Sequence, residues 1–315
     1  MNKKFDVIVI GELNVDLILN QIHSFPEIGK EKFADTMTLT LGSSAAIFAS
    51  NLSVLGMKVA FIGIVGNDVF GRFCKEELEK KGVDTSMILR NDVLETGATV
   101  VLNFDEDRAN ITYQGAMKLM NVQDISDEML AQARHLHFSS YFFQPGFKGQ
   151  LNCLFKNAKD AGLTTSFDIQ WDPIEQWDFN CNEVLPFVDV FMPNEAELLN
   201  VTKQHSFEKA LKALEKNANI IVVKRGNKGS LLWHNENILP CEAFVNHEVV
   251  DAIGAGDSFD AGFIFSFLQN RPLAQCQRFA NLIGAVSTTR AGGTTAFTHY
   301  REILRTAKEK FGYEE

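Results

Sequence analysis

The 315-residue sequence has few cysteines, and they do not lie in a pattern that binds a metal or builds a disulfide framework. They are scattered, odd in number and without a CxxC pair. This usage is typical of reduced thiols rather than of a zinc site or a secreted disulfide scaffold, and it favours a cytoplasmic protein. The five are Cys74, Cys153, Cys181, Cys241 and Cys276.

Long apolar runs and an excess of positive charge are also missing. No stretch approaches the roughly 20 apolar residues of a membrane helix. The apolar run near the N-terminus is interrupted by Asp6, Gly11 and Glu12, so neither a signal peptide nor a membrane partner is expected. The formal net charge is -10, and nucleic-acid binding relies on neutralising phosphates with Lys and Arg. The composition therefore argues against nucleic acid as the main partner.

Two common nucleotide-binding fingerprints are absent. The chain has no GxxxxGK[ST] and no GxGxxG that opens a helix. This argues against a P-loop NTPase and against a dinucleotide-dependent dehydrogenase. Low-complexity segments, internal repeats and Pro/Gly-rich linkers are missing as well, so we expect residues 1–315 to form a single domain.

What the sequence does contain is an alternation of short β-branched runs with helical stretches. Near-continuously apolar strands alternating with helices predict an α/β fold with a doubly wound, mostly parallel sheet and helices on both faces. Ligands of such folds bind at the carboxyl ends of the strands. The runs lie at 5–13, 58–66, 98–104, 135–142, 164–169, 188–194 and 219–226, and the helical stretches at 44–55, 70–81, 149–161 and 206–216.

Two segments break this alternation. Residues 33–41 alternate like a half-exposed strand, and residues 98–114 have the pattern of a β-hairpin. We expect them to belong to a small β-sheet lid over the edge of the main sheet, formed by about 14–41 and 97–117.

The run VVDAIGAGDSFDAG, residues 249–262, marks a junction before a helix. Residues 248–250 read as the end of a strand, and phenylalanines at i, i+4 and i+8 from Phe259 predict a buried helix. Gly254 and Gly256 then fall at the helix start, where unpaired backbone N–H groups and the helix dipole form an anion site.

Asp257 lies in or just before the first turn of this predicted helix. An aspartate beside an anion site can take a proton from an attacking hydroxyl. Aspartate is also favoured as a helix cap, and spacing alone leaves both interpretations open.

Six motifs in order, over essentially the whole chain, resemble the ribokinase-like (PfkB) carbohydrate kinases. The run 249–262 is similar to the DTxGAGD-type C-terminal signature of that family. The other five motifs are GELNVDLIL (11–19), the N-terminal signature at 41–71, PNEAE (193–197), VKRGNKG (223–229) and RFANLIGAVSTTRAGG (278–293). The resemblance implies the ribokinase-like fold and an ATP- and Mg²⁺-dependent kinase that phosphorylates a hydroxyl, expected to be primary, of a small sugar.

The resemblance also assigns roles at the nucleotide end. Asp257 is implied as the general base, and the backbone of Gly254, Ala255 and Gly256 as the anion hole for the transferring phosphoryl group. The implied Mg²⁺ pair, acting through water, is Asn194 and Glu197. The alternative for that pair is an ordinary helix-capping motif. The implied nucleotide-binding residues are Asn194, Lys224, Gly226, Gly229 and Asn281.

At the sugar end, Asn14 and Asp16 lie two apart after a strand, so both side chains can face one way. An amide and a carboxylate that point into a cleft suit paired sugar hydroxyls, although a turn or edge-strand pair is the alternative. The substrate-binding residues implied by the resemblance are Asn14, Asp16, Gly42, Ser43, Tyr141 and Asp168. The residues implied for a K⁺ site are Asp251, Ile253 and Gly292.

The chain departs from the family pattern around the sugar. Ala46 stands where the family has an asparagine that touches the sugar, and Asn51 is too far along the helix to replace it. Where some members have an acidic sugar contact, Ser140 or Tyr141 is available. These differences leave the identity of the sugar open.

Several alternatives therefore stay open. A nucleoside kinase is one, and a phosphosugar kinase, which would use Arg108 and Lys118, is another. A ligand-binding relative without catalysis is the third. His135 and His137 are interpreted as a partly buried strand pair rather than as metal ligands, because no other His or Cys completes a site. The resemblance further implies a homodimer that pairs through the lid.

Overall fold

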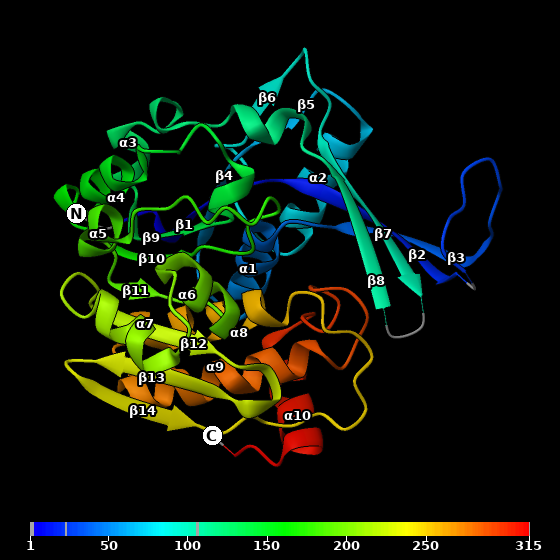
Figure 1. Ribbon diagram of the computed structural model, residues 1–315. Coiled ribbons are helices and arrows are strands. Elements are labelled where there is room, and N and C mark those ends of the chain that lie inside the picture. Colours follow the sequence, from blue (N-terminus) through cyan, green and yellow to red (C-terminus); the bar gives the residue numbers. More distant parts are fainter. Residues whose placement is uncertain (1–2, 23, 105–106, 315) are drawn as a thin grey trace.

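An eight-stranded sheet forms the centre of the molecule in the computed structural model, which describes residues 3–22, 24–104 and 107–314 (Figure 1). The strand order is β14-β13-β12-β11-β10-β9-β1-β4. Neighbours from β12 to β4 pair in parallel, and β13 and β14 add an antiparallel edge. The strands are β1 (Phe5–Ile10), β4 (Val59–Ile62), β9 (Ala133–Ser139), β10 (Thr164–Asp168), β11 (Val190–Phe191), β12 (Ile220–Lys224), β13 (Ser230–His234) and β14 (Asn237–Cys241).

Helices cover both faces of this sheet, which confirms the predicted fold class. Along β1, Val7 and Val9 belong to one buried core with α1, α8, α9 and α10, whereas Ile8 and Ile10 belong to a second core with α4, α6 and α7. Fully apolar strands are the consequence of burial on both faces. The helices are α1 (Ser44–Val54), α2 (Val69–Lys80), α3 (Asp127–Leu130), α4 (Leu151–Asp160), α5 (Cys181–Val184), α6 (Glu195–Thr202), α7 (Phe207–Leu214), α8 (Ala255–Leu268), α9 (Leu273–Ser287) and α10 (Tyr300–Phe311).

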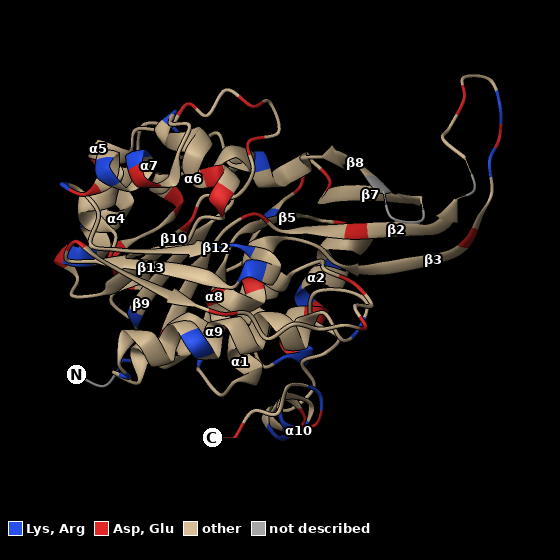
Figure 2. Cartoon of the chain, turned by 60° about the horizontal axis from the view of Figure 1, so that its bottom comes forward, with Lys and Arg blue, Asp and Glu red and all other residues tan. Residues whose placement is uncertain are grey.

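A second sheet, of order β3-β2-β7-β8, extends from one side of the body (Figure 1). We call it the lid sheet. Its strands lie within the two segments expected for the lid, 14–41 and 97–117, and its β2–β3 connection projects far from the body, with both signs of charge along it (Figure 2). The strands are β2 (Asn14–Ile22), β3 (Ala34–Leu41), β7 (Gly97–Phe104) and β8 (Asp107–Tyr113), and a separate short pair is formed by β5 (Ile64–Gly66) and β6 (Leu89–Asn91).

One expected strand is wrong. Residues 248–250 form an irregular loop in which Val249 and Val250 are 54% and 61% exposed. Two β-branched residues favour extended backbone, but a strand also needs a neighbouring backbone along its length. Here the Val250 N–H donates to the carbonyl of Thr288, at the end of α9, instead of to a strand.

Within the described residues, none of the helices combines the length and the apolar character that crossing a membrane requires.

Candidate active site

The start of α8 depends on a glycine. Gly254 is the N-cap with φ 72°, in the left-handed region, and a Cβ there would lie 2.7 Å from the Cα of Gly293. Any other residue would meet both backbone strain and a collision. The Ala255 N–H donates to the carbonyl of Ala252. The N–H groups of Gly256 and Asp257 are therefore the ones we assign to an anion at this helix start.

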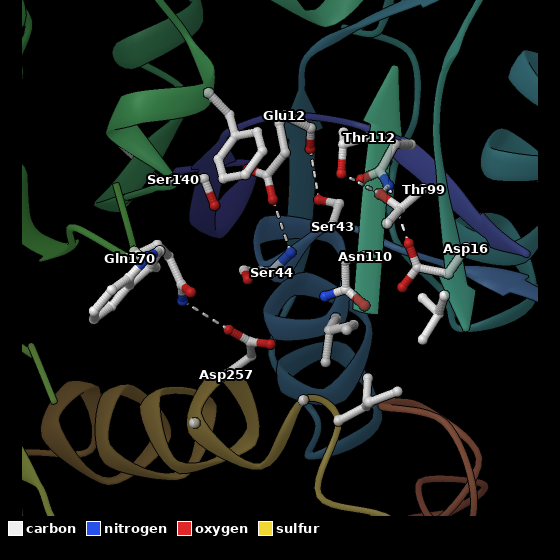
Figure 3. A pocket seen from close by; sticks show the side chains of 18 of the residues that line it. Glu12, Asp16, Ser43, Ser44, Thr99, Asn110, Thr112, Ser140, Gln170 and Asp257 are labelled. Carbon is white, nitrogen blue, oxygen red and sulfur yellow. Dashed lines mark hydrogen bonds between the residues drawn. The ribbon is translucent and has the colours of Figure 1, made fainter. Parts of the chain in front are cut away.

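Asp257 is the third residue of α8 and lines a cavity of about 490 Å³. It does not cap the helix, because the N-cap is Gly254. Its Oδ1 accepts a hydrogen bond of 3.1 Å from the Gln170 amide, shown in Figure 3. Burial, and then the charge of Asp168, raise the pKa of Asp257 to about 6 against the opposing effect of Lys224. The carboxylate is thus ionised at neutral pH and still able to accept a proton.

This cavity lies between the carboxyl ends of the strands and the lid sheet. We call it the sugar-side cavity, after the ligand that the sequence resemblance implies. The structure brings ten of the sequence-predicted residues together around it: Asn14, Asp16, Ser43, Asn194, Glu197, Lys224, Ile253, Gly254, Gly256 and Asp257. Other lining residues were not proposed as ligands from the sequence: Glu12, Ser44, Thr99, Asn110, Thr112 and Gln170. The lid residues among them, Thr99, Asn110 and Thr112, share the two-residue period of strand faces, a signal that was available in the predicted hairpin.

The lid sheet presents a linked polar face to the sugar-side cavity (Figure 3). The Asn14 amide donates to Asp16 Oδ1 and to Thr99 Oγ1, each at 3.1 Å, and Thr99 is 3.0 Å from the Thr112 hydroxyl. A Cβ at Gly42 would collide with Asp16 and with the Asn14 amide. Gly42 therefore supports this pair from behind.

Besides Gly42, two more of the expected sugar contacts are not among the residues that line this cavity. Tyr141 is buried and packs edge-on against Phe142 and Phe179, outside the cavity lining. Ser140, the other candidate, does line the cavity. Asp168 is 1% exposed and lies beneath the cavity floor, where it binds Lys224. A large phenol at position 141 gains more from the aromatic core than from a polar cavity, because burial of its ring is worth most there.

Lys224 lies at the wall between the sugar-side cavity and a second cavity. Its ammonium is 2.8 Å from Asp168 Oδ2 and 2.9 Å from Asp260 Oδ2. Burial alone would lower the pKa of Lys224, but the two carboxylates raise it well above its usual value. Two buried carboxylates thus hold an ammonium group at the wall between the two cavities.

The second cavity, of about 300 Å³, is the nucleotide-side cavity. Three residues that the resemblance implied for the nucleotide, Gly226, Gly229 and Asn281, line it together with Ala255, which was predicted for the anion hole. Gly229 has φ 80°, and a Cβ there would collide with the carbonyl of Cys241. The Asn281 amide donates to the carbonyls of the loop after β14, at 3.2 and 3.4 Å, so it braces the cavity wall.

Asn194 and Glu197 cap a helix and also lie where they could hold Mg²⁺, the two roles considered for them from the sequence. They form a reciprocal capping box at α6, with bonds of 2.9 and 2.8 Å, and both also line the sugar-side cavity. Burial, and then Asp168, raise the pKa of Glu197 to about 7. Among the described residues no cluster of three His, Cys, Asp or Glu side chains could hold a metal directly. One carboxyl and one amide fit Mg²⁺, which keeps several of its waters.

The three residues expected at a K⁺ site are adjacent. The Asp251 carboxylate accepts the N–H of Ile253 at 2.9 Å and that of Gly292 at 2.8 Å. It thus joins the loop before α8 to the loop after α9.

Asn51 and the two strand histidines have structural roles. The Asn51 amide donates to Ser258 Oγ and to the carbonyl of Gly293, both at 2.9 Å, and so ties α1 to α8. His135 and His137 are buried and hydrogen-bonded to Ser166 at 2.7 and 2.8 Å. Burial lowers the pKa of both imidazoles, so they stay neutral.

These features define a class: an α/β enzyme with a buried carboxylate and a helix N-terminus between a polar cavity beneath the lid sheet and a second, glycine-lined cavity. Residues 4–299 match the pfkB family carbohydrate kinases, and the chain belongs to that family. It is accordingly an ATP-dependent phosphotransferase with an alcohol group as acceptor, as predicted.

Relatives of the chain differ in what they are named for. It is 26% identical to a nucleoside kinase of Methanothermobacter thermautotrophicus over 100% of this chain and 99% of the relative. It is 28% identical to a 5-dehydro-2-deoxygluconokinase of Geobacillus thermodenitrificans, over 88% of this chain and 85% of the relative. A solved E. coli structure, described as a ribokinase II in complex with ATP and Mg²⁺, is 26% identical, with a TM-score of 0.81 over 96% of this chain and 98% of the other.

Proposed function

We propose that the protein transfers the γ-phosphate of ATP to a hydroxyl, expected to be primary, of a small sugar such as a ketose, a pentose or a sugar acid. The observation that carries this is the position of Asp257, a buried carboxylate at the first turn of α8 where the two cavities meet. A sugar hydroxyl in one cavity can give its proton to Asp257 while it attacks a phosphate presented from the other.

The chain's own residues supply most of the remaining chemistry. Gly256 lines both cavities, and its N–H and that of Asp257 would donate to the transferring phosphoryl group. The Lys224 ammonium supplies a positive charge at the wall between the two cavities. Bound Mg²⁺ would neutralise phosphate charge, and Asn194 and Glu197 would hold it through water. The lid sheet would close over the sugar and exclude water, which otherwise competes for the phosphoryl group.

A nucleoside kinase is the second candidate. Met117, Phe143 and Trp171 also line the sugar-side cavity, and Trp171 is 42% exposed, so an aromatic surface is available to a base. A phosphosugar acceptor has less support. Lys118 is exposed and is not one of the residues that line the cavity, and the side chain of Arg108 lies outside the described part of the structure.

The test is ADP release from Mg·ATP against ribose, fructose, 2-keto-3-deoxygluconate, common nucleosides and sugar phosphates. Saturable turnover with a sugar supports the proposal, and preference for a nucleoside selects the second candidate. ATP binding without turnover on any compound would favour a ligand-binding relative. The same assay in KCl and in NaCl tests K⁺ at Asp251, Ile253 and Gly292, since equal rates in both salts would contradict that site.

The acid side of the pH profile should report Asp257. Because the base must be ionised, kcat/KM for the sugar should fall about tenfold per pH unit below a pH of about 6. The Gln170 amide stabilises the ionised form, so Gln170→Leu should move this midpoint to higher pH. Steady-state kinetics from pH 4.5 to 8.5 measure both. An unchanged midpoint in the variant would mean that Gln170 does not control the base.

We also propose a homodimer that pairs through the outer face of the lid sheet. Met37, Ile111 and Tyr113 are 66%, 66% and 49% exposed there, on the face opposite to Asn110 and Thr112. Ile111→Asp places a charge in this apolar face and should convert the dimer to a monomer in size-exclusion chromatography with light scattering. Val69→Asp, which changes an equally apolar exposed residue on α2, should leave the dimer intact. A monomeric wild type at micromolar concentration would contradict the proposal.

A further inference from the structure

Glu12 is a buried acid in the sugar-side cavity without an assigned role. It follows the carboxyl end of β1 and is 5% exposed. One oxygen, Oε1, accepts the Ser44 N–H at 2.8 Å, at the N-terminus of α1. The Ser43 hydroxyl donates to the backbone carbonyl of Glu12 at 2.6 Å, so the main chain of Glu12 is held as well (Figure 3).

The second carboxyl oxygen of Glu12 is different. Oε2 is buried and makes no hydrogen bond to a described residue, although Glu12 lines the cavity. Burial raises the pKa of Glu12 to about 8. The nearby Ser140 hydroxyl opposes part of that shift. A buried oxygen without a partner is destabilising, and a hydrogen bond to a ligand hydroxyl would recover that loss.

The charges around the cavity restrict the ligand further. Glu12, Asp16, Glu197 and Asp257 are all acidic. Lys224 is the one cation among the described lining residues, and it is already bound to two carboxylates. A carboxylate or phosphate on the acceptor would meet the like charge of ionised Asp257 without a free cation to balance it.

We propose that Glu12 is a specificity-determining residue that hydrogen-bonds one hydroxyl of a neutral sugar through Oε2, in a cavity whose other acidic residues disfavour an anionic acceptor. This rests on the proposed kinase function and narrows it. Because the acid is protonated in the free enzyme, it can donate to the sugar hydroxyl while Oε1 keeps its bond to Ser44. A glutamine at the same position could do the same.

The experiment compares Glu12→Ala and Glu12→Gln with wild type on D-ribose, D-fructose, their monodeoxy analogues and 2-keto-3-deoxygluconate. Asp6→Ala is the matched control, since Asp6 is a carboxylate at the other end of β1 that also accepts a backbone N–H, from Lys58 at 2.8 Å. We expect Glu12→Ala to lower kcat/KM for the preferred neutral sugar by about 10- to 100-fold, with the KM for ATP unchanged. Glu12→Gln should stay within about fivefold of wild type, as should the control.

The monodeoxy sugars distinguish a direct hydrogen bond between Glu12 and the sugar from a purely structural role of Glu12 at α1. One of them should be a poor substrate for wild type and no poorer for Glu12→Ala, because the lost hydroxyl and the lost carboxyl belong to one hydrogen bond. Equal losses on every sugar would show that Glu12 only supports α1 and would overturn the proposal, as would preference of wild type for the sugar acid.

Measuring the shift in melting temperature with the same sugars distinguishes the role proposed for Glu12 from the proposed kinase function. Neutral sugars that stabilise wild type but not Glu12→Ala, without phosphorylation, would support the role of Glu12 and contradict the kinase proposal. Equal turnover in wild type and Glu12→Ala would support the kinase function and contradict the role of Glu12. Neither binding nor turnover with any neutral sugar would overturn the role of Glu12.

Discussion

Replacing Asp257 with asparagine should lower kcat by about 10³-fold while the affinity for ATP stays within a few-fold of wild type. The substitution keeps the size of the side chain and a carbonyl oxygen for the Gln170 amide, but it removes the group that takes the proton. In the proposed arrangement ATP binds mainly at the nucleotide-side cavity, which Asp257 does not line. Single-turnover kinetics with Mg·ATP, together with calorimetric titration of ATP, measure the two quantities separately.

The control for this variant is Glu302→Gln. Glu302 is the third residue of α10, as Asp257 is of α8, and it pairs with Arg305 at the surface. Its loss removes the same charge from the same place in a helix, so it reports any effect of the helix dipole. We expect unchanged turnover. Wild-type turnover in Asp257→Asn would refute the general-base role, and a large loss in Glu302→Gln would show that the assay reports stability.

Replacing Lys224 with methionine should lower the free energy of unfolding by about 3–5 kcal/mol and abolish turnover. Two carboxylates, Asp168 and Asp260, are each 1% exposed and would lose the cation that balances them. Breaking one side of a buried ion pair is much more costly than never having built it, because the partner charge stays buried without water. Urea denaturation followed by circular dichroism measures the loss, with the m-value as the check on two-state unfolding.

Lys159→Met is the matched control. Lys159 also binds an aspartate, Asp189, through both carboxylate oxygens, but the two side chains are 35% and 24% exposed. Water screens that pair, so we expect a loss of at most about 1 kcal/mol. The triple variant Lys224→Met, Asp168→Asn and Asp260→Asn should recover most of the stability but no activity. Equal losses in the two single variants would contradict the buried-triad explanation.

Much of the fold and part of the site could be predicted because their signals are local. The alternation of apolar strands with helices predicts a parallel sheet covered on both faces. The two segments that break this alternation, 33–41 and 98–114, predict strands of the lid. The need for glycine at Gly254 is a property of the backbone at a single position. The spacing of Asn14 and Asp16 likewise places both on one face of β2. The failed strand at 248–250 marks the limit of such local signals, since a partner strand is not encoded in the run itself.

The order of six motifs along the chain was therefore enough to predict the family, and signals between residues close together predicted the parallel sheet, the glycine-dependent helix start and the acid beside it. Which side chains meet depends on the folded structure. Gln170 reaches Asp257 across 87 positions, and Lys224 reaches Asp168 across 56. Only the order of β10, β12 and β1 in the sheet brings such residues to one edge, and only packing selects Ser140 over Tyr141 and leaves one oxygen of Glu12 without a partner. Burial and pairing are properties of the assembled core, so no window of sequence contains them.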